Sequence, residues 1–337
     1  MAIQTRPFDF NLAAMAVSAE VKKNLVFGAT FTNYTDTEAG YQGQTFSVVR
    51  SELLGDVQEI TPQELYGDNG VTEQNRIYND SQYDVVSVTL NTIISYGAKV
   101  RIDDATFVIT ELNLASTSNQ FVTPIVNKLV NYVEVKGLGV LTTASKATVN
   151  GVSNVLPDRD LSAANPEKVG ALVRRTFNRI NTVLSNREHN GVRPTTDQAN
   201  LFLAVGTEVK YWILADDTLG NRVDASGSDA ALRRAEVLPL SGFTIFTDNK
   251  LQAETVIAYT KDAIGMFTRA PAIAQGAKFS TVLTDNGIAF RYNVDHSTEK
   301  GSDVVLMDAF LGFAVMNPEF VVSQKFVFPG EDIEVAG

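Results

Sequence analysis

The chain has 337 residues, of which 44% are apolar and 20% are charged, so it has enough core-forming residues for a folded protein. It carries 28 lysine and arginine residues against 39 aspartate and glutamate residues, and this net charge of −11 argues against a protein whose main task is to bind nucleic acid. The absence of cysteine excludes disulfides, cysteine-ligated zinc and thiol catalysis.

The N-terminal 42 residues are predicted to form an extended arm that contains one short helix over about 12–25. The longest apolar run in this arm, Leu12 to Val17, is shorter than the apolar core of a secretory signal. No window of the sequence approaches the roughly 20 apolar residues that a membrane-spanning helix needs. We therefore expect a soluble protein that has no membrane partner and stays inside the cell in which it is made.

An acidic segment, residues 55–80, follows the arm and carries a net charge of −5 without any lysine. The stretches before and after it, 44–50 and 85–93, both resemble strands, and the second alternates apolar with polar residues. The pattern predicts an extended hairpin over residues 43–93. With ~15 residues per arm at ~3.3 Å per residue, this hairpin would reach ~50 Å, far enough to lie across a neighbouring molecule. A further strand is predicted over 99–112.

The next segment has the spacing of apolar residues that is typical of a helix. Its apolar residues recur at spacings of three and four, and Ser118 or Asn119 can cap the N-terminus of a helix that begins there. Glycine is the usual residue just after a helix, so Gly137 or Gly139 is predicted to end it. The sequence therefore predicts one long amphipathic helix over about 117–139.

A second helix is predicted from Pro166 onward. Asn165 is a suitable N-cap, proline fits the first helical position, and Glu167 complements the helix dipole. Residues 165–193 have a net charge of +4, which leaves three interpretations open: a solvated face, a face for nucleic acid, or a docking surface for an acidic partner. The basic residues outside the apolar stripe of this helix are Lys168, Arg174, Arg175 and Arg179.

The remaining elements are short, and the chain ends in strands. Asp285-Asn286-Gly287 predicts a tight turn between two of these strands. The only histidines, His189 and His296, lie in polar stretches that are predicted to be surface loops, and no nucleophile motif accompanies them. The oxygen-rich residues 216–229 match no calcium-binding spacing. We therefore expect no enzyme, no metal and no cofactor.

The order of the predicted elements resembles that of the major capsid protein of tailed bacteriophages. These elements are an arm, an acidic hairpin, a long helix, a body of mixed helices and strands, and a final group of strands. The resemblance is to the Hong Kong 97-type fold and, within it, to the coat proteins of podophages. It covers nearly the whole chain and depends on element order rather than on an invariant motif. The stretches that carry it are 121–141, 175–206, 237–250 and 287–322.

The resemblance implies an α+β fold divided as in that family. The division would be an N-terminal arm (1–42), an E-loop hairpin (43–93), a first part of the P-domain (94–164) with a spine helix at about 117–139, an A-domain (165–288), and a P-domain return with the C-terminus (289–337).

The resemblance also implies a structural protein that assembles through hexamers and pentamers into an icosahedral virion shell around double-stranded DNA, in the cytoplasm of a bacterial host. Its partners would be other copies of itself, a portal protein and DNA contacted on the inner face without sequence specificity. A separate scaffolding protein is expected because the arm begins near Met1, and no E-loop lysine cross-link is expected because no lysine lies between Lys23 and Lys99. The candidates for inter-subunit contact are Asp56, Glu59, Glu64, Asp68 and Glu73 in the hairpin, with the four basic residues of the second helix as a docking face.

Two alternatives stay open at this point. One is a nanocompartment shell of the encapsulin type, which has the same fold and encloses cargo proteins. The other is a different phage structural protein, such as a tail tube, in which a long spine helix would be out of place.

Overall fold

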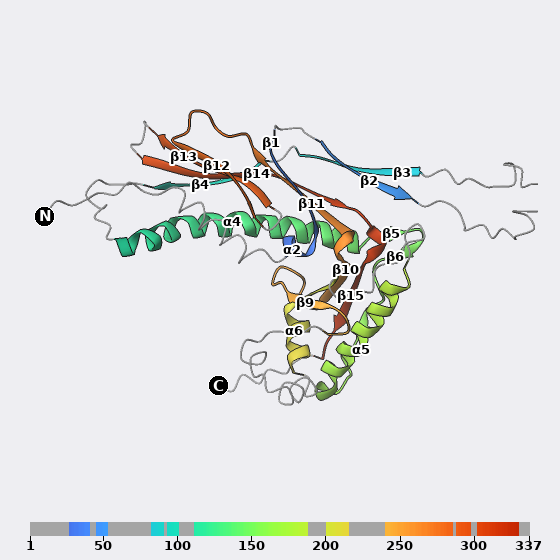
Figure 1. The fold of residues 1–337 in the computed structure, drawn as a ribbon. Coiled ribbons are helices and arrows are strands. Elements are labelled where there is room, and N and C mark those ends of the chain that lie inside the picture. The colour runs from blue at the N-terminus through green and yellow to red at the C-terminus, as the bar shows by residue number, and fades with distance from the viewer. Residues whose placement is uncertain are drawn as a thin grey trace, which may run out of the picture.

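A helix of 35 residues, α4 (Glu111–Ser145), runs along one face of a six-stranded sheet, and a second lobe of shorter elements lies beside its C-terminal half (Figure 1). A separate two-stranded hairpin packs on the six-stranded sheet. The computed structural model describes residues 27–40, 45–52, 82–90, 93–100, 111–187, 200–215, 240–285, 288–297 and 302–329.

The six-stranded sheet provides the surface on which α4 packs. Its strand order is β1-β11-β14-β13-β12, and β4 pairs with β14 as well. β1 runs parallel to β11, and the other pairs are antiparallel. The register of β12 with β13 places Asp285 opposite Ile288, as the predicted tight turn requires. The strands are β1 (Thr32–Gly40), β4 (Ile93–Val100), β11 (Ile264–Pro271), β12 (Phe279–Asp285), β13 (Ile288–Ser297) and β14 (Ser302–Val315).

The long helix exists, but its predicted limits of about 117–139 are wrong at both ends. It begins at Glu111, so Ser118 lies inside the helix instead of capping it. At the other end it continues through Gly137 and Gly139 to Ser145. Serine and glycine are typical of helix ends, but tertiary contacts override such local preferences when the surrounding helix is held by its packing.

Gly137 has a packing role instead of a terminating one. A Cβ atom at this position would lie 2.9 Å from the ring of Phe31, which is fully buried. Phe31 follows the short helix α2 (Phe27–Thr30), and its ring meets Phe313 of β14 edge-on at 6.2 Å and lies 5.9 Å from the ring of Tyr259. The glycine therefore forms a notch in α4 that receives an aromatic ring from the N-terminal segment.

The second lobe is built on a five-stranded sheet in the order β7-β15-β10-β8-β9. The helix α5 (Pro166–Ser185) packs on it and begins as predicted, with the Asn165 side chain accepting a hydrogen bond from the Glu167 N–H at 3.1 Å. The predicted apolar stripe of α5 is buried, including Phe177. The other elements are β7 (Arg159–Asp160), β8 (Leu201–Val205), α6 (Thr207–Leu214), β9 (Thr244–Thr247), β10 (Thr255–Thr260) and β15 (Val321–Val327).

The chain passes three times between the two sheets. β11 and β12 belong to the six-stranded sheet, although they precede the domain boundary expected at residue 288, and β15 belongs to the five-stranded sheet, although it follows that boundary. The sheets therefore do not divide at residue 288. The short elements that join them are β5 (Thr148–Val149), β6 (Val152–Ser153) and the 3₁₀ turns η3 (Lys261–Ala263) and η4 (Pro318–Phe320).

The two glycines of α4 provide a test of the notch. A Cβ at Gly139 meets nothing within 4 Å, so Gly139→Ala should raise the free energy of unfolding by ~0.5 to 1 kcal/mol, the usual gain in a helix. Gly137→Ala should lower it by roughly 1 to 2 kcal/mol, because the overpacking against Phe31 exceeds that gain. Chemical denaturation of both variants measures the difference. Equal effects of the two substitutions would contradict the notch.

Candidate functional site

The hairpin stem consists of β2 (Thr45–Glu52) and β3 (Gln82–Thr89), which pair antiparallel from Thr45 opposite Thr89 to Glu52 opposite Gln82. The strands predicted on both sides of the acidic segment are therefore present and paired. In Figure 1 the stem points away from the body of the molecule. The stem ends at Glu52 and Gln82, which flank the segment 53–81 in the sequence.

The stem has one apolar and one polar face, because successive residues of a strand point to opposite sides. On the polar face, the hydroxyls of Thr45 and Thr89 and those of Ser47 and Ser87 are each 3.1 Å apart and hydrogen-bonded across the strands. On the apolar face, half-buried side chains cover a buried cluster of Leu90, Phe267, Phe310 and Met316; these side chains are Phe46, Val48, Val86 and Val88.

The stem and α4 lie on opposite faces of the six-stranded sheet. Phe313 of β14 points toward α4, where its ring lies 3.5 Å from the position of a Cβ at Gly137. The preceding residue, Gly312, faces the other side, where a Cβ would lie 2.7 Å from Val88 and 2.8 Å from Leu90. The close approach of the stem to the sheet therefore depends on a glycine in β14.

The acidic candidates of the hairpin, Asp56, Glu59, Glu64, Asp68 and Glu73, lie outside the described residues. The structure describes the stem that carries them and not their own positions. Their contact with another subunit stays a prediction.

The structure divides the basic candidates of α5 into two groups. Lys168, Arg175 and Arg179 are exposed, and their spacing of seven and four residues places them on one side of the helix, opposite the buried stripe. Arg174 is half-buried on the flank of the helix. We call Lys168, Arg175 and Arg179 the basic α5 face.

Arg187, which the sequence analysis counts only as a positive charge, has a structural role after the end of α5. Its guanidinium donates to the Asn154 side chain at 2.5 Å, to the Glu319 carbonyl at 2.9 Å and to the Ser153 carbonyl at 2.9 Å. Asn154 in turn donates to the carbonyl of Ala144 at the end of α4 at 2.8 Å. Burial lowers the pKa of Arg187, but an arginine remains charged at any ordinary pH. This residue therefore joins α5, α4 and the start of β15.

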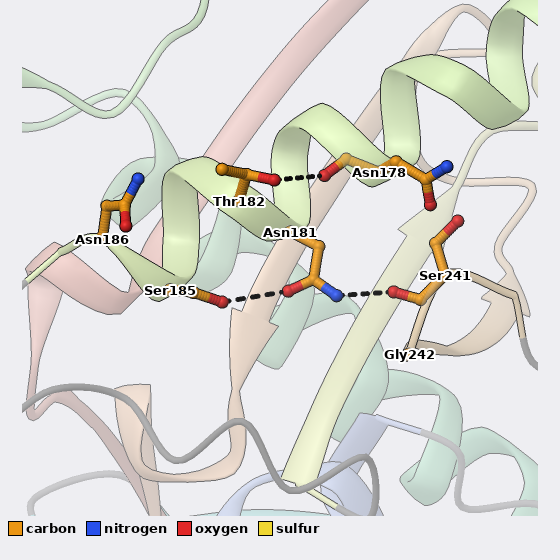
Figure 2. Close-up of a pocket in the computed structure, with 7 residues that line it drawn as sticks. All are labelled: Asn178, Asn181, Thr182, Ser185, Asn186, Ser241 and Gly242. Atoms are coloured by element: carbon orange, nitrogen blue, oxygen red, sulfur yellow. Dashed lines mark hydrogen bonds between the residues drawn. The ribbon is translucent and has the colours of Figure 1, made fainter.

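A polar pocket of about 550 Å³ opens between α5 and the turn before β9 (Figure 2). Asn181 donates to the Ser241 carbonyl at 2.6 Å and accepts from Ser185 at 3.1 Å. Ser241 has a positive φ of 56°, and this hydrogen bond from α5 holds the turn that requires it. The lining consists of amide and hydroxyl groups without an ionisable side chain: Asn178, Asn181, Thr182, Ser185, Asn186, Ser241 and Gly242.

The predicted loop position of His296 is wrong, because this residue lies in β13, opposite Asp303 of β14. His189 lies outside the described residues. Among the described residues, no three side chains of histidine, aspartate or glutamate gather into a group that could hold a metal ion. None of the helices in this part of the chain is long and apolar enough to cross a membrane.

The clamp formed by Arg187 leads to a stability prediction. Arg187→Met should lower the free energy of unfolding by about 2 to 3 kcal/mol, because it removes charged hydrogen bonds and takes this donor from the Asn154 side chain and the partly buried Glu319 carbonyl. Arg179→Met, in the exposed basic α5 face, is the matched control and should stay within ~0.5 kcal/mol. Urea unfolding curves of the two variants test this, and a similar loss in both would show that Arg187 is not a structural clamp.

No protein-family model matches the chain, and no curated protein sequence matches it. Solved structures do. The capsid structure of cyanophage P-SCSP1u matches 90% of this chain and 88% of its own, with a TM-score of 0.58 and 11% sequence identity. The asymmetric unit of the mature capsid of bacteriophage PhiM1 matches 90% of this chain and 87% of its own, with a TM-score of 0.53 and 12% identity. The chain therefore has the α+β fold of these two phage capsid structures, in agreement with the Hong Kong 97-type fold that the sequence predicts.

Proposed function

We propose that this chain is the major capsid protein of a tailed phage, a structural subunit that assembles through hexamers and pentamers into an icosahedral shell around double-stranded DNA. The observation that carries the proposal is the likeness to two phage capsid structures over about nine tenths of the chain. The activity of such a protein is self-association, and we assign it no catalytic residue.

The hairpin supports this proposal because its construction suits a contact with another molecule. Its stem is anchored on Gly312 and the Phe267 cluster, and the segment that follows has a net charge of −5 and few large apolar residues to add to its own core. A polar, charged surface is typical of the rim of a protein contact, where complementary charge sets the register. We propose that the acidic segment reaches a neighbouring subunit.

The basic α5 face is the receiver that we propose for this segment. It presents Lys168, Arg175 and Arg179 to solvent, and the guanidinium of arginine matches a carboxylate with two parallel hydrogen bonds. A separate scaffolding protein, a portal protein and assembly in the bacterial cytoplasm complete the proposal as expectations from the family.

Negative-stain electron microscopy of the purified protein tests the proposed function. We expect closed icosahedral shells under some assembly condition, and particles from infected cells that contain DNA. Shells that contain cargo protein instead would indicate a nanocompartment, and tubes would indicate a tail protein. A protein that forms no regular assembly at any salt concentration or with any phage lysate would contradict the proposal.

The charge contact is tested by a double-mutant cycle on assembly. One variant changes Glu59, Glu64, Asp68 and Glu73 to their amides, and the other changes Lys168, Arg175 and Arg179 to glutamine. Each exposed pair contributes only ~0.2 to 1 kcal/mol, but every subunit repeats the contact, so each variant should raise the concentration needed for assembly and flatten its dependence on salt.

The combined variant separates pairing from general charge effects. If the two groups meet, the combined change should raise the assembly concentration by less than the sum of the separate changes, in free-energy terms. Strict additivity would mean that the acidic segment and the basic α5 face contact different partners.

A further inference from the structure

The exposed side of α4 carries a second basic surface that the contact proposed above does not use. Lys128, Lys136 and Lys146 are exposed, and they lie along about 27 Å of helix at 1.5 Å per residue. Over residues 126–146 the acidic side chain is Glu134, which is only 7% exposed and accepts a hydrogen bond from the Gly28 N–H at 3.4 Å. In a chain with a net charge of −11, this helix face is thus positive over residues 126–146.

A pocket of about 480 Å³ continues this surface into the second lobe. Its wall contains Asn127 and Asn131 of α4 together with Lys210 of α6 and Lys250 after β9. The ammonium of Lys250 donates to the side-chain oxygen of Asn131, so the lysine is held against α4. The opposing charges in the wall are Glu134 and Asp248, and Asp248 accepts the backbone N–H of Lys250 at 2.8 Å.

We infer that this surface, which we call the α4 lysine face (Lys128, Lys136 and Lys146 with the adjoining Lys210 and Lys250), contacts the phosphate backbone of nucleic acid. The inference deepens the proposed capsid function and depends on it, because it assigns the face of the subunit that meets the packaged DNA. Lysines on flexible stems provide point charges without a fixed geometry, which suits contact with phosphates irrespective of base sequence.

The architecture supports this assignment. A subunit of a shell has one broad face toward the contents and one toward the exterior. The sheet separates the α4 side from the hairpin side, as the opposite directions of Phe313 and Gly312 show. A face turned toward a polyanion should have little exposed negative charge, since each exposed carboxylate would repel the phosphates. The described part of α4 meets this condition.

Lys136 and Lys146 also have contacts of their own within the subunit. The ammonium of Lys136 lies 5.5 Å from the ring centre of Tyr132, where it can form a cation–π contact. Lys146 follows the C-terminus of α4, where a positive charge interacts favourably with the helix dipole. Both contacts leave the ammonium groups exposed to solvent. A test therefore needs a control with the same loss of charge elsewhere.

The test compares two variants with equal net charge. One combines Lys128→Gln, Lys136→Gln and Lys146→Gln, and the control combines Arg159→Gln, Lys261→Gln and Lys325→Gln, three exposed residues outside both the α4 lysine face and the basic α5 face. The probe is a mixed-sequence duplex DNA, titrated against dispersed subunits over a range of salt concentrations. We expect the α4 variant to bind roughly tenfold more weakly at ~0.1 M salt, with a salt slope shallower by about 2 to 3, and the control variant to bind like the unchanged protein.

Thermal unfolding verifies that both variants fold, and electron microscopy of the same preparations separates the two proposals. Shells from a folded α4 variant that retains full DNA affinity would overturn the inference and leave the capsid function intact. An equal loss of DNA affinity in both variants would also overturn the inference, because it would indicate an effect of net charge. A folded α4 variant that no longer assembles would overturn it too, because this face would then be a subunit contact. DNA binding that depends on α4, in a protein that never forms shells, would instead overturn the capsid function.

Discussion

The packing of α4 against the six-stranded sheet is the contact on which the rest of the molecule depends. One side of the helix is buried, with Val126, Leu129, Val133 and Leu141 in the largest apolar cluster of the described chain. The same cluster takes in alternate residues of β13 and β14, so one face of the sheet is committed to the helix. The other face is left for the hairpin stem. The positions of the stem and of the α4 lysine face on opposite sides follow from this one layer arrangement.

Two small residues make the layers close enough to pack. Gly137 lets the ring of Phe31 enter α4 from one side, and Gly312 lets Val88 and Leu90 approach β14 from the other. The Thr30 hydroxyl and the Tyr259 hydroxyl, 2.6 Å apart and buried, add a polar link at the first of these contacts. The desolvation that raises the pKa of Tyr259 keeps its hydroxyl protonated and able to donate to Thr30. Both contacts join segments that are far apart in the sequence.

The junction of the two lobes is partly apolar, because Tyr259 of β10 and Val321 of β15 belong to the same cluster as α4, and partly polar. Arg187 and Asn154 connect the end of α4 with the end of α5 through hydrogen bonds to carbonyl groups. Such a network holds only a narrow range of orientations, since each donor has a fixed direction. For the capsid subunit that we propose, the orientation of one lobe to the other would decide how neighbouring copies meet. The directed hydrogen bonds of Arg187 and Asn154 add a fixed orientation to the apolar contact between the lobes.

The sequence by itself determined the elements whose signals are local. Asn165 and Pro166 located the start of α5, the alternation after residue 85 located β3, and the order of the elements indicated the fold that the structural comparison shows. These signals are reliable because capping and side-chain alternation depend on neighbours along the chain.

Only the tertiary structure decided what depends on distant residues. Gly137 has the local character of a helix end, and nothing near it in the sequence shows that the ring of Phe31, 106 positions away, occupies the space of its missing side chain. The charge of Arg187 is visible in the sequence, but its use as a clamp depends on carbonyl groups of residues 153 and 319. The polar neighbours of His296 predict a loop, whereas the residue lies in β13 and pairs with Asp303 of β14. Burial and strand pairing depend on residues that are distant in the sequence. The spacing of apolar residues therefore predicts them only where one face of an element packs on the core.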